Sequence, residues 1–257
     1  MISALYKPLG TSTHQLAQRW GELQQQPATH TGTLDPMADG VVIVLSGLDR
    51  FNKTALSNWQ KTYQFEIWWG VQTDSLDLLG LTTKIAKFDL NQFPSTGLDT
   101  DQLQDQLAMV LPKFLGPQPQ TLPHFAAKRM AGQSYFDLAK RGEKFQPAVE
   151  EVVIHQLQLL ANFSLAKNQL HQAIQQRLSL VEGDFRQTEI LANWADQIPQ
   201  LPPQLFFSHL TTTTSKRTYI RALVRDLAVA VGLPATTFAL TRTQNGPYGI
   251  QDCLCLI

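Results

Sequence analysis

Residues 41–47, with the sequence VVIVLSG, constrain the fold more than any other stretch of this chain. An unbroken run of β-branched and apolar residues is typical of a buried strand. A second strand pattern, at 63–70, alternates between apolar and polar positions. The alternation places four large side chains on one face of that strand: Tyr63, Phe65, Ile67 and Trp69. These two patterns predict a sheet as the framework of the fold.

Helical patterns stand near both ends of the chain. Ser12 and Gln15 form the capping-box pattern that begins a first helix. Its apolar stripe consists of Leu16, Trp20 and Leu23. A last helix carries apolar residues at helical spacing and ends at a glycine: Ile220, Leu223, Val224, Leu227, Val231 and Gly232.

The middle of the chain is less regular. Residues 99–111 are predicted to form a helix, 112–123 a proline-rich link, and 152–165 a strand. The glutamine-rich segment 166–203 carries no pattern that assigns it, and 204–221 holds a further strand that leads into the last helix. No internal repeat is evident. We therefore expect an α+β fold with non-local strand pairing rather than repeated β-α-β units.

Composition sets the class of protein. The 257 residues suit one large domain, and a hydrophobic content of 43% is enough for a core. Because 21 basic residues balance 21 acidic ones, any attraction to nucleic acid must come from local patches. Cys253 and Cys255 cannot form a disulfide framework and are expected to be packed thiols rather than a metal site. No apolar run approaches the roughly 18 residues that span a bilayer, so we expect a soluble, cytoplasmic protein.

Asp35 lies in the loop HTGTLDP, at 30–36, shortly before the buried strand. Because Asp-Pro is common in turns, a surface turn is the simplest interpretation. An active-site loop is the alternative. Gly32 allows a ligand close to the backbone, and the strand after the loop is a rigid mount for a catalytic carboxylate.

Arg221 and Tyr63 each have a structural and a functional interpretation. Arg221 and Arg225 lie four residues apart, on one face of the last helix. There they form either a solvated basic face or a site where a planar guanidinium holds a carboxylate or phosphate. Tyr63 is either a core aromatic or a ring on which a base stacks.

Residues 124–144 are locally basic, with five cations against two acids and hence a charge of +3. Phe125, Tyr135 and Phe136 interleave with the cations. Such a composition is typical of an RNA-contacting element, although many surface helices share it.

Six motifs in this order resemble one family, the bacterial tRNA pseudouridine-55 synthases or TruB family. The His-Thr-Gly-x-Leu-Asp-Pro segment, which resembles that family's nucleophile loop, is the most specific of them. The motifs are KPLGTS (7–12), HTGTLDPMADGVVIVLSG (30–47), KTYQF (61–65), GVQTDSLD (70–77), SKRTYIR (215–221) and ALTRTQNGPY (239–248).

The resemblance implies an isomerase that detaches a uracil from its ribose, rotates it and rejoins it through carbon, without a metal or organic cofactor. Asp35 would be the nucleophile, and attack on the ribose C1′ or on the base both stay open. Arg221 would pair with Asp35 and keep it ionised, because a nearby cation favours the charged form of a carboxylate. Tyr63 would stack on the uracil and help to move a proton.

The resemblance also implies a substrate, the T-arm of tRNA at position 55, whose uridine must leave its stack before it reacts. Residues 120–147 would be an insertion that clasps this arm. The protein would act as a monomer, without a membrane or protein partner. Leu240 would pack on the other side of the base, and His30 would fill the space that the uridine leaves. Substrate contacts are implied for Lys7, His30, Gly32, Asp77, Lys216, Leu240 and Arg242.

The chain departs from the family pattern at several places. Arg217 stands where the family usually has glycine, and the residues after Asp77 are LLG where an acid and small residues are usual. Residues 166–203 are expected to be an extra insertion between two strands. Residues 1–257 would form a single pseudouridine synthase catalytic domain, without the family's C-terminal RNA-binding domain.

Two other functions are compatible with these motifs. One is a non-catalytic RNA-binding or tRNA-folding protein on the same scaffold, which would have no need of Asp35, Tyr63 and Arg221 together. The other is a pseudouridine synthase that acts on another RNA site or through a guide-RNA complex.

Overall fold

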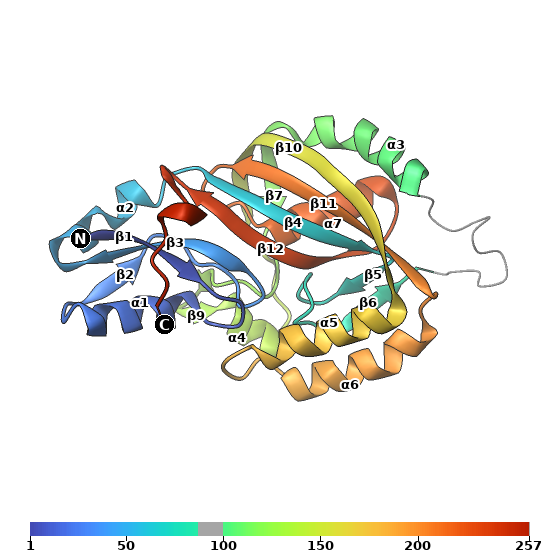
Figure 1. Ribbon diagram of the computed structural model, residues 1–257, viewed down its shortest axis with the longest axis horizontal. Coiled ribbons are helices and arrows are strands. Elements are labelled where there is room, and N and C mark those ends of the chain that lie inside the picture. Colours follow the sequence, from blue (N-terminus) through green and yellow to red (C-terminus); the bar gives the residue numbers. More distant parts are fainter. Residues whose placement is uncertain (87–99, 257) are drawn as a thin grey trace.

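The computed structural model describes residues 1–86 and 100–256, built around a curved, nine-stranded sheet (Figure 1). Its strands are β1 (Ile2–Lys7), β2 (Ala28–His30), β3 (Asp39–Ser46), β4 (Lys61–Trp69), β7 (Gly116–Thr121), β10 (Val149–Ala166), β11 (Gln204–Thr214), β12 (Ala235–Asn245) and β13 (Tyr248–Gly249). The order is β1-β3-β12-β4-β11-β10-β7, with β2 beside β3 and β13 beside β12. Among the described strands of this sheet, β3 and β12 alone pair in parallel. The expected α+β fold with a mixed, mainly antiparallel sheet is therefore confirmed.

Helices cover both faces of the sheet. They are α1 (Thr13–Leu23), α2 (Lys53–Leu56), α3 (Thr100–Val110), α4 (Tyr135–Lys140), α5 (Lys167–Ser179), α6 (Gln187–Gln197) and α7 (Ile220–Val231), with short 3₁₀ turns η1 (Gly47–Asn52), η2 (Leu111–Phe114), η3 (Ile198–Gln200) and η4 (Ile250–Asp252). Residues of α1, α3 and α7 join one core cluster with the sheet. Residues of α5 and α6 join a second cluster, beside the small hairpin of β5 (Val71–Thr73) and β6 (Thr82–Ile85). Figure 1 shows α5 and α6 side by side below the sheet.

Two strands follow their predicted patterns. Residues 41–46 of β3 are all buried, as expected for an unbroken apolar run between two neighbouring strands. In β4 the alternation places Phe65, Ile67 and Trp69 in the first core cluster, and Trp68 points to the second. The sheet is therefore covered on both faces where β4 lies.

The ends of the predicted helices are mostly confirmed. Ser12 and Gln15 form the expected capping box at the start of α1. Gly232 ends α7 in the left-handed conformation, with φ of 82°. The prediction for Leu23 is wrong, because its side chain is 65% exposed while Leu16 and Trp20 are buried. Leu23 is the last residue of α1, so the apolar stripe ends one turn earlier.

The prediction of a proline-rich link at 112–123 is wrong, because this segment contains strand β7. β7 pairs with β10 and forms one edge of the sheet. Pro117 and Pro119 lack a backbone N–H, and an edge strand tolerates this loss on its unpaired side. The proline signal therefore marked a sheet edge, not an irregular connection.

The segment TDSLDLLG at 73–80, whose polar residues predict a polar loop, is also a correction. Leu76, Leu78 and Leu79 are buried, and a backbone bond from the Thr237 amide to the Leu76 carbonyl fastens the loop to β12. Asp77 is buried among them. The loop is a packed support behind the sheet.

The remaining segments are resolved as follows. α3 begins at Thr100, so residue 99 of the predicted helix lies outside the described residues. The unassigned segment 166–203 forms α5 and α6, which connect β10 to β11. Cys255 is exposed, so the prediction of two packed thiols is wrong for it. Within the described part of the chain, no helix is both long and apolar enough to cross a bilayer.

Candidate active site

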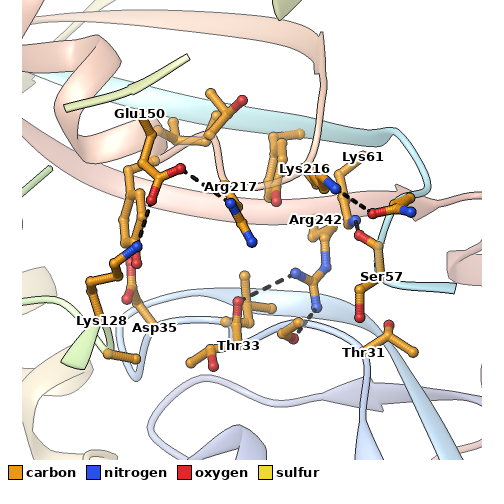
Figure 2. A pocket seen from close by; sticks show the side chains of 18 of the residues that line it. Thr31, Thr33, Asp35, Ser57, Lys61, Lys128, Glu150, Lys216, Arg217 and Arg242 are labelled. Carbon is orange, nitrogen blue, oxygen red and sulfur yellow. Dashed lines mark hydrogen bonds and ion pairs between the residues drawn. The ribbon is translucent and has the colours of Figure 1, made fainter. Parts of the chain in front are cut away.

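A pocket of about 570 Å³ opens beside Asp35, between the loop at 31–35, strands β4 and β12, and the turn before α7 (Figure 2). This volume lies within the roughly 300–1,000 Å³ of ordinary small-ligand pockets. Its carboxylates are Asp35 and Glu150. Its cations are more numerous: Lys53, Lys61, Lys128, Lys216, Arg217 and Arg242. A chain with no net charge therefore gathers positive charge here, as an anionic partner requires.

The loop that carries Asp35 is fixed from below. The Thr13 hydroxyl donates to the Leu34 carbonyl at 2.9 Å, and the Leu34 amide donates back to the Thr13 oxygen at 2.8 Å. The Gly10 amide donates to the Pro36 carbonyl at 2.8 Å. Because residues on both sides of Asp35 are held, its carboxylate has a defined position at the pocket wall.

Arg242 on β12 holds the same loop from the other side. Its Nε donates to the Val41 carbonyl at 2.6 Å, and its terminal nitrogens lie 3.4 and 3.5 Å from the carbonyls of Gly32 and Thr33. Gly40 lets β12 come this close, because its φ is 111° and an added Cβ would collide with the Arg242 backbone. Arg242 is 1% exposed, and its hydrogen bonds support the loop.

Arg221 and Asp35 form a bidentate ion pair. Arg221 Nε donates to Asp35 Oδ2 at 2.8 Å, and Nη2 donates to Oδ1 at 2.9 Å. Two further bonds run to the carbonyls of Ser75, at 2.6 Å, and Phe125, at 2.9 Å. The pairing implied by the resemblance is present. The fork of Arg221 fixes the plane of the Asp35 carboxylate, while the Asp35 side chain stays 26% exposed.

Asp77 supports this pair from within the protein. Its Oδ2 lies 3.6 Å from Arg221 Nε, and its Oδ1 accepts bonds from the Ser75 hydroxyl and the Leu79 amide. Burial alone would lower the pKa of the Arg221 guanidinium, but the charges of Asp35 and Asp77 outweigh it and raise that pKa. Arg221 also stands in the first turn of α7, where the helix dipole disfavours a cation. Two carboxylates therefore stabilise one buried cation. Asp77 itself does not line the pocket.

Tyr63 and Leu240 lie on adjacent strands, β4 and β12, and both line the pocket. Each is 7% exposed, so each presents a small part of its side chain to the space beside Asp35. The stacking of a uracil on the Tyr63 ring, with Leu240 on its other side, stays a prediction.

Besides Asp77, two of the predicted substrate contacts lie outside this pocket. Lys7 is fully buried and donates to the carbonyls of Pro8, at 3.0 Å, and Thr11, at 2.7 Å. It is in no position to touch a substrate, and it supports the turn that bonds to Pro36. His30 lines a neighbouring hollow with His14, and burial lowers its pKa to about 4. Lys53 lines both spaces and so marks their border.

The aromatic residues within 124–144 pack on one another and on neighbouring segments, and their predicted contact with RNA stays a prediction. Tyr135 is buried and packs on Phe145 at 4.8 Å between ring centroids, and Phe125 and Phe136 contact each other at 5.9 Å. The two-residue strands β8 (Arg129–Met130) and β9 (Gln133–Ser134) and helix α4 complete this unit. The aromatics therefore hold the segment folded and leave its cations outward.

The loop between α5 and α6 braces this region from behind. The Arg186 guanidinium lies 4.6 Å from the centre of the Phe125 ring and forms an ion pair with Asp74 at 3.0 Å. Phe185 contacts Phe136, at 5.1 Å between ring centroids. Because the Phe125 carbonyl accepts a bond from Arg221, Phe125 is one link between segment 166–203 and the site.

Comparison with known proteins identifies the family. The family model for the N-terminal domain of TruB family pseudouridylate synthases matches residues 21–179, more than half of the chain. The chain belongs to the TruB family. A tRNA pseudouridine synthase B of Deinococcus radiodurans is 29% identical, over 99% of this chain and 77% of its own length. One of Bordetella avium is also 29% identical, over 99% of this chain and 84% of its own length. The family predicted from the motifs is confirmed.

The fold of this TruB-family chain is also found in solved structures. A chain of a Cbf5-Nop10-Gar1 complex aligns with a TM-score of 0.57 and 17% identity, over 99% of this chain and 52% of that one. The present chain thus spans about half the length of that solved chain. At this identity the likeness concerns the fold.

Position 217, where the resemblance to the TruB family predicts a glycine, has a backbone conformation that suits glycine. Arg217 has φ of 65°, a left-handed conformation that glycine adopts without strain. The chain therefore keeps a glycine backbone while it carries a long cation. Lys216 lines the pocket beside Arg217 and donates to Asn58 Oδ1 at 2.5 Å. Its contact with the substrate stays a prediction.

Sequence reasoning missed Lys61, Lys128 and Glu150 as parts of the site. Lys61 is 6% exposed, donates to the carbonyls of Ser57 and Trp59, and burial lowers its pKa to about 8. A signal for Lys61 existed, because it stands two residues before Tyr63 and therefore on the same face of β4. No local pattern in the sequence predicts that Glu150 lies at the pocket. It is carried there by β10, the strand next to the edge strand β7.

Proposed function

We propose that this chain isomerises uridine to pseudouridine at position 55 in the T-arm of tRNA, with Asp35 as the nucleophile. One observation carries the proposal: a partly exposed carboxylate, fixed bidentately by a buried arginine, lies beside a tyrosine and a leucine in a basic pocket. The family and its tRNA-modifying relatives set the class of reaction.

The isomerisation exchanges one bond for another. The bond from N1 of uracil to the ribose C1′ breaks, the base turns, and a bond from C5 to C1′ forms. C5 loses a proton and N1 gains one, so the change is balanced without an oxidant or reductant. A carboxylate oxygen of Asp35 is the nucleophile, and it attacks either C1′ or the base. Arg221 acts through Asp35, since its fork holds the carboxylate in one orientation.

The pocket requires an extruded base. A uridine that is stacked in a folded RNA arm cannot bring its glycosidic bond to a carboxylate at a pocket wall. The pocket volume suits a single nucleotide, and the cations around it meet the flanking phosphates. Residues 120–147 lie at this pocket through Leu122 and Lys128, which supports their role as the clasp of the T-arm.

The direct test is to incubate the protein with an unmodified tRNA transcript and map pseudouridine along it. Product at position 55 alone supports the proposal. Product at another position would identify a synthase of different specificity, and tight binding without product would indicate a non-catalytic RNA-binding protein.

Tyr63 gives a prediction that separates stacking from proton transfer. Tyr63→Phe keeps an aromatic face and Tyr63→Leu does not, so the leucine variant should lose more single-turnover rate if stacking is the main role. Stacking on one base contributes about 1–3 kcal/mol, which is roughly five- to hundredfold in rate or affinity. A phenylalanine variant as slow as the leucine variant would assign the effect to the hydroxyl instead.

The charge distribution gives a prediction about substrate size. Positive charge gathers around Asp35 in a chain with no net charge, so binding should depend on the T-arm. A T-arm hairpin should react with a kcat/KM within roughly tenfold of whole tRNA, which allows about 1.4 kcal/mol for all other contacts. The salt slope should be shallow, because few phosphates are neutralised and each contributes about 0.7 to 0.9. A hairpin hundreds of times slower would show that a second surface binds the tRNA.

A further inference from the structure

Three charged side chains from separate segments meet at the pocket (Figure 2). Glu150, near the start of β10, accepts a bond from Lys128 of the clasp at 2.6 Å, from Nζ to Oε1. Its second oxygen lies 3.3 Å from Nη1 of Arg217, in the turn before α7. One carboxylate thus joins two cations, and none of the three takes part in the chemistry assigned to Asp35.

Stability does not account for the arginine of this cluster. Arg217 holds a left-handed backbone, which is unfavourable for a residue with a side chain. Its ion pair with Glu150 adds little to the stability of the fold, because the Arg217 side chain is 64% exposed and exposed ion pairs contribute little. Strain of this kind is characteristic of functional sites.

We propose that Lys128 and Arg217 form a binding site for one phosphate of the substrate RNA, and that Glu150 occupies this site until RNA arrives. The proposal rests on the proposed function in taking RNA as the ligand. Carboxylate and phosphate each present two oxygens to lysine and arginine, so one replaces the other with the same donors. The Lys128 hydrogen bond, more than any other contact, keeps the pKa of Glu150 below its usual value, so the group is charged at neutral pH.

The exchange has two consequences for binding. Lys128 and Arg217 carry two positive charges against the one negative charge of Glu150, so the cluster keeps a net charge of +1 that attracts a phosphate. Because Glu150 must be displaced, the site also selects for a correctly placed phosphate. A phosphate held by both cations would also connect the clasp to the turn that precedes α7. Since Arg221 stands in the first turn of α7, the phosphate would settle next to the element that orients Asp35.

Arg217→Gly is the central test, because glycine removes the cation and suits the backbone. The dissociation constant for an unmodified T-arm hairpin should rise at least about fivefold, the scale of one charge-assisted bond. The salt slope should fall by about 0.7 to 0.9. The melting temperature should stay level or rise by up to about 4 °C, because strain is relieved. Lys84→Gln removes the same charge from β6, outside the pocket, and should change the dissociation constant by less than about twofold.

Glu150→Gln tests the other half of the proposal. Without the competing carboxylate, the hairpin should bind about twofold more tightly or better. Unchanged binding by Arg217→Gly, a fall of several degrees in its melting temperature, or weaker binding by Glu150→Gln would each overturn the proposal. Pseudouridine is measured separately: a wild-type protein that binds the hairpin through Arg217 yet forms no product refutes the proposed function and leaves the phosphate site standing.

Discussion

Asp35→Asn should abolish pseudouridine formation while the protein still folds and binds RNA. The amide keeps the size of the side chain and one acceptor oxygen for Arg221, but it loses the negative charge that attacks. Arg221 keeps a carboxylate partner, because Asp77 lies 3.6 Å from its Nε. Single-turnover rates with an unmodified tRNA transcript should fall by at least about a thousandfold, or roughly 4 kcal/mol of barrier.

Asp39→Asn provides the matched control for this experiment. Asp39 begins β3, four residues after Asp35, and accepts bonds from the Tyr6 hydroxyl at 2.8 Å and the Thr241 hydroxyl at 2.6 Å. It does not line the pocket, and its amide would still accept one bond. This variant should keep its activity. Near-normal turnover by a pure Asp35→Asn protein would refute the nucleophile assignment.

The parts of the fold that follow from local chemistry were predictable from the sequence. The capping box at Ser12, the buried run of β3 and the glycine stop at Gly232 each depend on a few neighbouring residues. The pairing of β10 with both β7 and β11 does not, because these strands come together over long separations in sequence. The prolines of β7 led to the wrong prediction of an irregular link for the same reason. Whether a strand tolerates proline depends on its place at the edge of the sheet, which the local sequence does not show.

The candidate site was likewise predictable from the sequence only in part. The motifs placed Asp35, Arg221, Tyr63 and Leu240 in one family pattern, and the structure brings all four to one region. The resemblance implied that Lys7 and Pro8 shape the floor beneath the nucleophile loop. The sequence did not reveal that Lys7 and Asp77 are buried, because exposure depends on what packs over a residue. Nor did it reveal the Lys128–Glu150–Arg217 cluster, whose members come from three segments that are distant along the chain.

Arg221→Lys should slow the chemical step more than it weakens RNA binding. Lysine keeps the charge but replaces the planar fork with a single ammonium, so the two bonds to Asp35 and the bonds to the Ser75 and Phe125 carbonyls cannot all form. The Asp35 carboxylate would then lose its fixed orientation. We expect the single-turnover rate to drop tenfold or more, which corresponds to about 1.4 kcal/mol or greater.

The control and the temperature decide how this result is interpreted. Arg221 is buried with two carboxylates, so the lysine variant should also unfold at a lower temperature, and its rate must be measured well below that point. Arg225→Lys makes the same change one turn later on α7, where the arginine bonds to Asp226 and the Thr121 carbonyl, and it should keep a near-normal rate. If Arg221→Lys weakens RNA binding while its single-turnover rate is intact, Arg221 binds phosphate and does not position Asp35. The bidentate contact at 2.8 and 2.9 Å argues for the opposite result, because the other bonds of this buried guanidinium go to the Ser75 and Phe125 carbonyls and leave no exposed edge for a phosphate.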